Sequence, residues 1–318
     1  MPLKLPDRLP AIELLKQENI FVMDSTRASG QDIRPLRLAI LNLMPIKITT
    51  ETDFIRILSN TPLQVEIDFM KIKSHTSKNT PVEHMMAFYR DFEEMRQEKY
   101  DGLIVTGAPL EHMDYEDVTY WSELQDVFNW AYHHVQSTCY ICWAAQAALY
   151  HFYGIPKYST EKKVFGVFRH HILQPSLPIF RGFDDEFYAP HSRHSEILRA
   201  DIEKKNEELS KQSVDGTDNL LHIISESDDA GVHIVMARDG RDFFITGHSE
   251  YAPLTLDGEY RRDLAKGLPI DIPQHYYRDD NPELGPMVRW RAHANLLFTN
   301  WLNYYVYQTT PFNINDIV

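Results

Sequence analysis

Apolar residues occur along the chain in two patterns, short continuous runs and longer segments with helical spacing. The segment 36–44 (LRLAILNLM) is almost continuously apolar, and 63–72 (LQVEIDFMKI) is a second run of this kind. Such runs are typical of strands covered on both faces, as in a parallel sheet. The segments 83–100 and 121–131 have apolar residues at helical spacing, and we expect each of them to form a helix.

The alternation of strand and helix continues through the middle of the chain. A short apolar stretch at 103–105 ends at the motif TGAP, residues 106–109. The segment 137–142 (STCYIC) precedes an alanine-rich helical segment that Gly154 closes. Strands that alternate with helices of about 10–18 residues predict βαβ units and a parallel sheet.

The second half adds a strand at 220–227, a hairpin at 232–251 with an Asp-Gly turn, and a long helix near 287–307. No internal repeat or low-complexity linker divides the chain. We therefore expect an α/β fold with a mostly parallel sheet flanked by helices. An N-terminal arm over 1–35 would precede a single domain over 36–318, which ends in the C-terminal helix.

Composition narrows the classes of function. The 318 residues carry a formal net charge of −14, which argues against non-specific binding to nucleic acid or an anionic membrane, since both need a basic face. No apolar run approaches the roughly 18 residues of a membrane span, and the N-terminus lacks a secretory apolar region. Two cysteines cannot build a disulfide framework, so we expect a cytoplasmic protein in a reducing compartment.

The two cysteines, Cys139 and Cys142, are three residues apart in the predicted strand 137–142. Successive side chains of a strand point to opposite faces, so we expect Cys139 to point with Ser137 and Cys142 with Tyr140. Thiols on opposite faces can neither bridge one another nor share a metal. A redox or zinc CxxC site is therefore not expected, and Cys139 is interpreted as a core residue.

Cys142 lies where the strand meets the following helix, a position that resembles a nucleophile elbow. A helix N-terminus favours the thiolate form of a cysteine, and the backbone N–H of Trp143 is free to bind an oxyanion. These features indicate a nucleophile, although a buried and inert thiol is the alternative that this stretch leaves open.

A cysteine nucleophile needs a base, and the end of the hairpin supplies a candidate. In FFITGHSEY, His248 and Glu250 follow the strand two residues apart, so in extended geometry both point the same way. The carboxylate of Glu250 can then orient the imidazole of His248 in a Cys–His–Glu triad at the ends of parallel strands. A polar strand end facing solvent is the alternative.

Several long strings together resemble one family. TGAPLEHMDYEDVTYW, CYICWAAQAALYHFYGIPK, RGFDDEFYAPHSRHSEI and TGHSEYAPLTLDGEYRRDL are similar to the homoserine O-acyltransferases of methionine biosynthesis, and the similarity extends from about residue 35 to about residue 305. This resemblance implies the class I glutamine amidotransferase-like fold, a flavodoxin-like arrangement. It also implies a homodimer that uses L-homoserine and an acyl-CoA as substrates, with no further cofactor.

The resemblance implies a ping-pong reaction. Cys142 would take the acyl group as a thioester, and the hydroxyl of homoserine would then attack it. His248 would act as base and acid, Glu250 would orient it, and backbone donors of the TGAP loop and Trp143 would hold the oxyanion. The substrate-binding positions that match the family are Lys47, Lys163, Ser192 and Arg262, and Arg262 suits a bidentate grip on the homoserine carboxylate.

One position bears on the acyl donor. In this family the residue after TGAPL is glutamate in users of acetyl-CoA and glycine in users of succinyl-CoA, and here it is Glu111. The negative charge and bulk of Glu111 would oppose the distal carboxylate of succinyl. We therefore expect acetyl-CoA as donor and O-acetyl-L-homoserine as product. Homoserine O-succinyltransferase and a glutamine amidotransferase-like cysteine hydrolase are the alternatives.

The sequence departs from the amidotransferase pattern at two places, and it contains several histidine pairs. Tyr140 and Ala144 replace the glycines that usually flank the elbow cysteine in amidotransferases, which argues against glutamine hydrolysis. Ser249 stands where proline is common. Histidine pairs such as those at 133–134, 170–171 and 191–194 have no acidic partner at ligand spacing, so no metal is expected.

Overall fold

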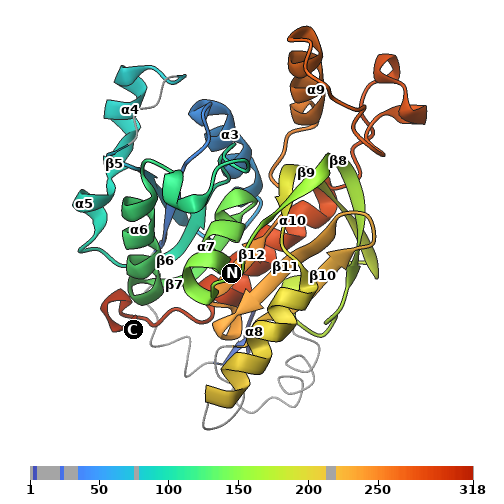
Figure 1. Ribbon diagram of the computed structural model, residues 1–318. Coiled ribbons are helices and arrows are strands. Elements are labelled where there is room, and N and C mark those ends of the chain that lie inside the picture. Colours follow the sequence, from blue (N-terminus) through green and yellow to red (C-terminus); the bar gives the residue numbers. More distant parts are fainter. Residues whose placement is uncertain (1–2, 6–21, 25–34, 75–78, 213–219, 318) are drawn as a thin grey trace.

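The computed structural model describes residues 3–5, 22–24, 35–74, 79–212 and 220–317. Its main feature is a ten-stranded sheet in the order β5-β4-β3-β6-β7-β12-β11-β10-β8-β9 (Figure 1). The strands are β3 (Leu36–Leu41), β4 (Val65–Lys71), β5 (Tyr89–Asp91), β6 (Tyr100–Val105), β7 (Val135–Ile141), β8 (Tyr158–Ile172), β9 (Glu186–Glu196), β10 (His222–Ser227), β11 (Gly231–Ala237) and β12 (Asp242–Ile245).

Helices cover both faces of this sheet. Those of the described chain are α3 (Lys47–Leu58), α4 (Val82–Phe88), α5 (Phe92–Met95), α6 (Trp121–His134), α7 (Trp143–Tyr153), α8 (Arg199–Gln212), α9 (Thr255–Ala265), α10 (Arg291–Asn300) and a π-helical continuation, η6 (Trp301–Tyr307). Short 3-10 turns are η1 (Tyr115–Asp117), η2 (Pro178–Phe180), η3 (Arg238–Gly240), η4 (Arg278–Asp280), η5 (Pro282–Leu284) and η7 (Ile314–Asp316).

Two apolar cores follow from the alternation of side chains along the strands. In β3, Ala39 and Leu41 belong to the core shared with α5, α6 and α7, whereas Leu38 and Ile40 belong to the core shared with α3, α10 and η6. All four side chains are fully buried, which is why the run 36–44 shows no polar alternation. The expected α/β fold, with a sheet covered on both faces, is confirmed.

The sheet is parallel in one half and antiparallel in the other. Pairs from β5 to β12 are parallel, whereas β12, β11, β10, β8 and β9 pair antiparallel in succession. The Asp-Gly turn between β11 and β12 is confirmed, with Asp239 and Gly240 at positive φ. The parallel part is therefore only slightly larger than the antiparallel part, because the long hairpin β8–β9 extends the sheet without crossover helices.

The helix expected over 83–100 is wrong in its middle. It divides into α4 and α5, and between them β5 joins the edge of the sheet beside β4. Tyr89 explains the break, since its ring packs on Phe69 and its hydroxyl donates to Glu51, contacts that an extended backbone provides. The C-terminal helix begins at Arg291 rather than at 287, and η6 continues it to Tyr307.

Most of the predicted N-terminal arm lies outside the described residues. Within it, the short strands β1 (Leu3–Leu5) and β2 (Val22–Asp24) pair in parallel. Among the described residues, none of the helices combines the length and the apolar character needed to cross a membrane.

Candidate active site

Cys142 sits on a sharp turn between β7 and α7. Its φ of 51° and ψ of −113° put it in a conformation that non-glycine residues rarely adopt, and its side chain is buried. Its N–H donates to Ile245 O over 2.7 Å, which ties it to the end of β12. The nucleophile-elbow geometry expected from the strand–helix junction is therefore present.

Cys139 lies in the core as predicted, but the face argument for Cys142 is wrong. Strand β7 ends at Ile141, so the alternation of side chains does not extend to Cys142. The turn instead places Cys142 in the same apolar core as Cys139 and Ile141, away from the core that contains Tyr140. Both cysteines are nevertheless free, so the conclusion that they form no disulfide holds.

His248 reaches Cys142 because β7 and β12 are parallel neighbours. Ile141 and Ile245 are paired in register, so the residues after both strands emerge at the same edge of the sheet. The backbone N–H of His248 donates to Pro190 O over 2.8 Å, and its ring stacks on Tyr251 at 4.2 Å between centroids. The imidazole Nδ1 lies 2.7 Å from Glu250 Oε1, as the spacing of these two residues predicted.

The charges of this group favour an imidazolium. Burial alone would lower the pKa of His248, but the negative charges of Cys142 and Glu250, with a hydrogen bond to each, raise the pKa well above its usual value. A protonated His248 stabilises a thiolate at Cys142, which is the nucleophilic form of cysteine. The geometry of a Cys–His–Glu triad is thus assembled from the ends of β7 and β12.

The TGAP loop lies close against Cys142 and His248. A Cβ added to Gly107 would lie 3.3 Å from Cys142 Cβ and 3.4 Å from His248 Cε1, so only a residue without a side chain leaves room here for a reacting group. Trp143 is the first residue of α7, and an N–H at that position has no partner within its helix. Both features suit the expected oxyanion site, whose donors stay a prediction.

A cavity of 240 Å³ opens beside Cys142 and His248. Its other lining side chains come from segments that are far apart in the sequence: Met44, Pro45, Ala108, Pro109, Glu111, Lys163, Ser192, His194, Tyr251, Glu259, Arg262 and Asp263. The structure therefore brings Lys163, Ser192, Arg262 and Glu111 to the nucleophile, as predicted.

Glu259 is a site residue that the sequence analysis missed. Its carboxylate accepts hydrogen bonds from Lys163 Nζ over 3.1 Å, Ser192 Oγ over 2.5 Å and the Tyr251 hydroxyl over 3.3 Å. It lies on α9 three residues before Arg262, so both side chains share one face of the helix. That spacing is the signal from which Glu259 could have been found.

Two predicted binding residues have partners of their own. Arg262 is half exposed and forms two hydrogen bonds to the carboxylate of Asp263, over 2.7 and 3.0 Å. Lys47 does not line the cavity, because its ammonium is buried and donates to Asn42 O over 2.6 Å and Met44 O over 3.3 Å. Burial lowers the pKa of Lys47 to about 8. Lys47 thus supports the turn that carries Met44 instead of facing the cavity.

Glu111 borders the cavity on a loop that Lys157 holds. Burial raises the pKa of Glu111, partly offset by a backbone hydrogen bond and by the positive charges of His248, His112 and Lys163. The Lys157 ammonium donates to Glu111 O over 2.7 Å and to the carbonyl of Met113. It also lies 4.9 Å from the centroid of the Tyr115 ring. One lysine therefore fixes the backbone on both sides of His112.

A family model described as homoserine O-succinyltransferase matches residues 2–312 of this chain. The chain belongs to this family. A homoserine O-acetyltransferase of Phocaeicola vulgatus is 69% identical over 317 residues and covers 100% of both chains. One of Acetivibrio thermocellus is 57% identical over 317 residues, also with 100% of both chains covered. Both names describe those relatives, and the names differ from the family description in the acyl group.

Solved structures show the same fold at low sequence identity. A glutamine amidotransferase from Thermotoga maritima is 12% identical, with a TM-score of 0.53, and the match covers 85% of this chain and 98% of that one. The protein SMU.1228c is also 12% identical, with a TM-score of 0.54 and coverage of 84% and 99%. This member of the homoserine O-succinyltransferase family therefore has the glutamine amidotransferase-like fold that the resemblance implied.

Behind the triad, three histidines form a buried cluster. Ring nitrogens of His170, His191 and His233 lie within 4.8 Å of one another, and burial lowers the pKa of all three, so they are neutral. The buried guanidinium of Arg193 lies 3.4 Å from His191 Nδ1, and its positive charge would repel a divalent cation. A Cβ on Gly247 would come within 2.8 Å of His233, so the cluster packs directly against the backbone before His248.

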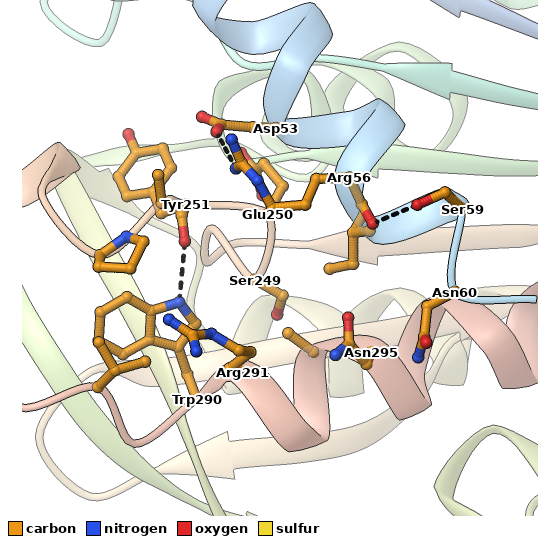
Figure 2. Close-up of a pocket in the computed structure, with 15 residues that line it drawn as sticks. Asp53, Arg56, Ser59, Asn60, Ser249, Glu250, Tyr251, Trp290, Arg291 and Asn295 are labelled. Carbon is orange, nitrogen blue, oxygen red and sulfur yellow. Dashed lines mark hydrogen bonds and ion pairs between the residues drawn. The ribbon is translucent and has the colours of Figure 1, made fainter.

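A second cavity, of 510 Å³, lies on the other side of Glu250 between α3 and α10 (Figure 2). Glu250 Oε2 is buried there and has no hydrogen-bond partner among the described residues. Asp53 is also buried and accepts from Arg56 Nη1 over 2.7 Å. Burial raises the pKa of Asp53, and the charge of Glu250 adds to this increase. Tyr251 lines both cavities.

Proposed function

We propose that this protein transfers an acetyl group from acetyl-CoA to the hydroxyl of L-homoserine, which gives O-acetyl-L-homoserine for methionine biosynthesis. The observation that carries the proposal is the convergence of Cys142, His248 and Glu250 beside a small cavity lined by Glu111, Glu259 and charged partners. The names of the close relatives, homoserine O-acetyltransferases, support the substrate and the acyl group.

The first half-reaction forms a thioester. The Cys142 thiolate attacks the carbonyl carbon of the acyl-CoA, and N–H groups near Gly107 and Trp143 stabilise the oxyanion that develops. The carbon–sulfur bond to CoA then breaks, and the proton of the His248 imidazolium passes to the departing thiolate. Glu250, 2.7 Å from His248 Nδ1, holds the ring and its tautomer throughout.

The second half-reaction transfers the acyl group to the acceptor. Neutral His248 takes the proton of the homoserine hydroxyl as the oxygen attacks the thioester carbon. The bond to Cys142 breaks, the ester leaves, and the thiolate–imidazolium pair is restored. The hydroxyl must therefore enter the cavity within reach of both His248 and the acylated cysteine.

Charges in the cavity complement an amino-acid zwitterion. Arg262 offers a planar pair of donors to the homoserine carboxylate, and Glu259 offers a carboxylate to its ammonium group. In this structure the guanidinium of Arg262 donates a hydrogen bond to Asp263, while Lys163 and Ser192 donate to Glu259. These existing contacts hold both groups in place before the substrate arrives. Ser192 thus acts by positioning the carboxylate of Glu259, and the ammonium of Lys163 balances the negative charge of Glu259.

Glu111 favours acetyl over succinyl as the acyl group. The positive charges of His248 and Lys163 act on the Glu111 carboxylate, so Glu111 borders the space next to the nucleophile. The cavity volume of 240 Å³ suits homoserine with a short acyl group. A distal carboxylate would meet the like charge of Glu111 in a partly desolvated site.

The test is intact-protein mass spectrometry followed by product analysis. The protein is mixed with acetyl-CoA or succinyl-CoA without acceptor, and the mass of the protein and the modified peptide are determined. We expect one acetyl group on the peptide that contains Cys142, and its loss with formation of O-acetylhomoserine when homoserine is added. No adduct with either donor would overturn the thioester. A succinyl adduct alone would favour the succinyltransferase alternative.

We also propose that the enzyme acts as a cytoplasmic homodimer without a metal or organic cofactor. The two free cysteines are consistent with a reducing compartment. Light scattering coupled to gel filtration would measure the mass of the assembly, and activity after dialysis against a chelator would test the absence of a metal requirement.

A further inference from the structure

The acyl donor is much larger than the cavity beside Cys142. That cavity has a volume of 240 Å³ and is shared with homoserine, whereas ligand pockets for whole drug-sized molecules have about 300–1,000 Å³. Most of a CoA molecule must therefore bind elsewhere on the protein. Its phosphate groups also need local cations, because the chain as a whole has a formal net charge of −14.

The second cavity has the size and the position for this part of the donor. It has a volume of 510 Å³, and the segment Ser249–Tyr251, which carries the carboxylate bound to His248, forms part of its wall. Tyr251 lines both cavities, so a ligand that passes over its side chain would reach from one to the other. Figure 2 shows the cavity between α3 and α10, with Ser249 and Glu250 between the two helices.

Two arginines face this cavity from opposite helices, Arg56 from α3 and Arg291 from α10 (Figure 2). Within the described residues the guanidinium of Arg56 bonds only Asp53, through Nη1, so its other N–H groups can serve as donors. The guanidinium of Arg291 forms no ion pair or hydrogen bond with any part of the described chain. The amide of Asn295, one turn further along α10, adds a neutral donor.

Both acidic residues of the cavity have a basic partner in the described chain. Glu250 Oε1 lies 2.7 Å from His248 Nδ1, so this carboxylate is held by the imidazole that it shares with Cys142. Asp53 is paired with Arg56 at 2.7 Å. Among the charged side chains that line the cavity, the guanidinium of Arg291 alone has no partner of opposite charge in the described chain, and an anion is the ligand that it attracts. Apolar surface for a flat or aliphatic group comes from Ile57, Pro253, Val288 and Ala294.

We propose that this second cavity binds the phosphate-bearing end of the acyl-CoA, with Arg291 as the principal phosphate contact and Arg56 and Asn295 as supporting donors. The proposal rests on the function proposed above, in that acyl-CoA is the donor. It assigns the thioester end to the cavity beside Cys142 and the nucleotide end to the cavity behind Glu250.

The experiment compares a full donor with a truncated one. Acetyl-CoA and S-acetylpantetheine carry the same thioester, but only acetyl-CoA has the nucleotide phosphates. We expect Arg291→Ala to raise KM for acetyl-CoA about tenfold to a hundredfold, the range for losing one charge-assisted hydrogen bond, and to leave kcat and KM for S-acetylpantetheine unchanged. Arg291→Lys should retain part of the affinity because the charge remains.

Arg289 provides the matched control. It lies two residues away, lines neither cavity, and stacks 5.6 Å from the centroid of the Tyr188 ring. Arg289→Ala should leave the ratio of KM for acetyl-CoA to KM for S-acetylpantetheine as in the wild type. Equal changes for both donors in Arg291→Ala, or no change for either, would overturn the assignment.

A binding measurement tests the cavity without turnover. Calorimetry with adenosine 3′,5′-bisphosphate should show binding to the wild type and weaker binding to Arg291→Ala. Absence of binding to the wild type at millimolar concentration would reject the nucleotide site even if acetyl transfer is observed. A wild type that binds the bisphosphate but accepts no acyl-CoA would instead contradict the proposed function.

Discussion

Replacing Glu111 tests how the enzyme selects its acyl donor. The side chain borders the cavity next to Cys142, where the distal carboxylate of a succinyl group would have to lie. Two like charges about 4 Å apart repel by about 1 kcal/mol in water and about 4 kcal/mol at an effective dielectric constant of 20. At about 1.4 kcal/mol per factor of ten, this range corresponds to a preference for acetyl of roughly fivefold to a thousandfold. Glu111 is half-buried, so we expect the upper part of the range.

Two substitutions separate charge from volume. Glu111→Gln keeps the size of the side chain and removes its charge, whereas Glu111→Gly removes both. If charge dominates, Glu111→Gln should lose most of the preference, and Glu111→Gly should add little more. Glu116 is a suitable control, since it lies in the same loop, binds the Tyr150 hydroxyl over 2.7 Å and does not line the cavity.

The assay is kcat/KM for acetyl-CoA and succinyl-CoA with homoserine, measured as a function of pH. Because burial raises the pKa of Glu111, its negative charge is present above that pKa and lost below it. The preference for acetyl should therefore decrease as the pH falls through this pKa, and the decrease should be absent in Glu111→Gln. A wild type that prefers succinyl-CoA, or a donor ratio unchanged in both variants, would refute the reasoning.

Four further substitutions probe the two cysteines, the carboxylate that orients His248 and the loop beside them. Cys142→Ser should reduce acyl transfer by several orders of magnitude, while Cys139→Ser should keep most activity, and steady-state rates showing the reverse would contradict the assignment. Glu250→Gln should slow alkylation of Cys142 by iodoacetamide at pH 7, because His248 loses the charge that raises its pKa. The protonated His248 paired with Glu250 also stabilises the folded protein. The wild type should therefore exceed Glu250→Gln in melting temperature most clearly below pH about 6.5, and this difference should be lost as the pH rises through the raised pKa of His248. Lys157→Met removes two hydrogen bonds to carbonyl groups of the Glu111 loop, so it should weaken the preference for acetyl-CoA over succinyl-CoA at a nearly unchanged melting temperature. An unchanged preference would argue against this role of Lys157.

Local order along the chain was enough to predict that Cys142, His248 and Glu250 meet at one edge of the sheet. Cys142 follows an apolar strand and precedes an alanine-rich helix, and His248 and Glu250 follow another strand two residues apart. Each signal lies within one continuous stretch of the chain, and strand ends in a parallel sheet meet at one edge by construction. The placement of these three side chains and the fold class could therefore be predicted from the sequence without knowledge of distant contacts.

The alternation rule failed where the backbone left the strand. It placed Cys142 on the face of Tyr140, but a positive φ at Cys142 turns the side chain toward the other core. Similarly, the helical pattern over 83–100 gave no indication that Tyr89 would be drawn to the sheet edge by Glu51. Local propensity is a weak determinant at such positions, because tertiary contacts worth more than the propensity decide the conformation.

Only the tertiary structure decided how the cavity beside Cys142 is completed. Lys163 and Ser192 lie on the hairpin β8–β9, and Glu259 lies on α9, almost a hundred residues beyond Lys163. The convergence of Lys163 and Ser192 on the carboxylate of Glu259 depends on how the antiparallel half of the sheet is placed against α9. No local pattern in the sequence indicates this placement. The cavity behind Glu250 has the same origin, since it forms where α3 and α10 cover one face without closing the space between them. Sequence determines which residues can react, whereas packing of distant segments determines which of them share a site.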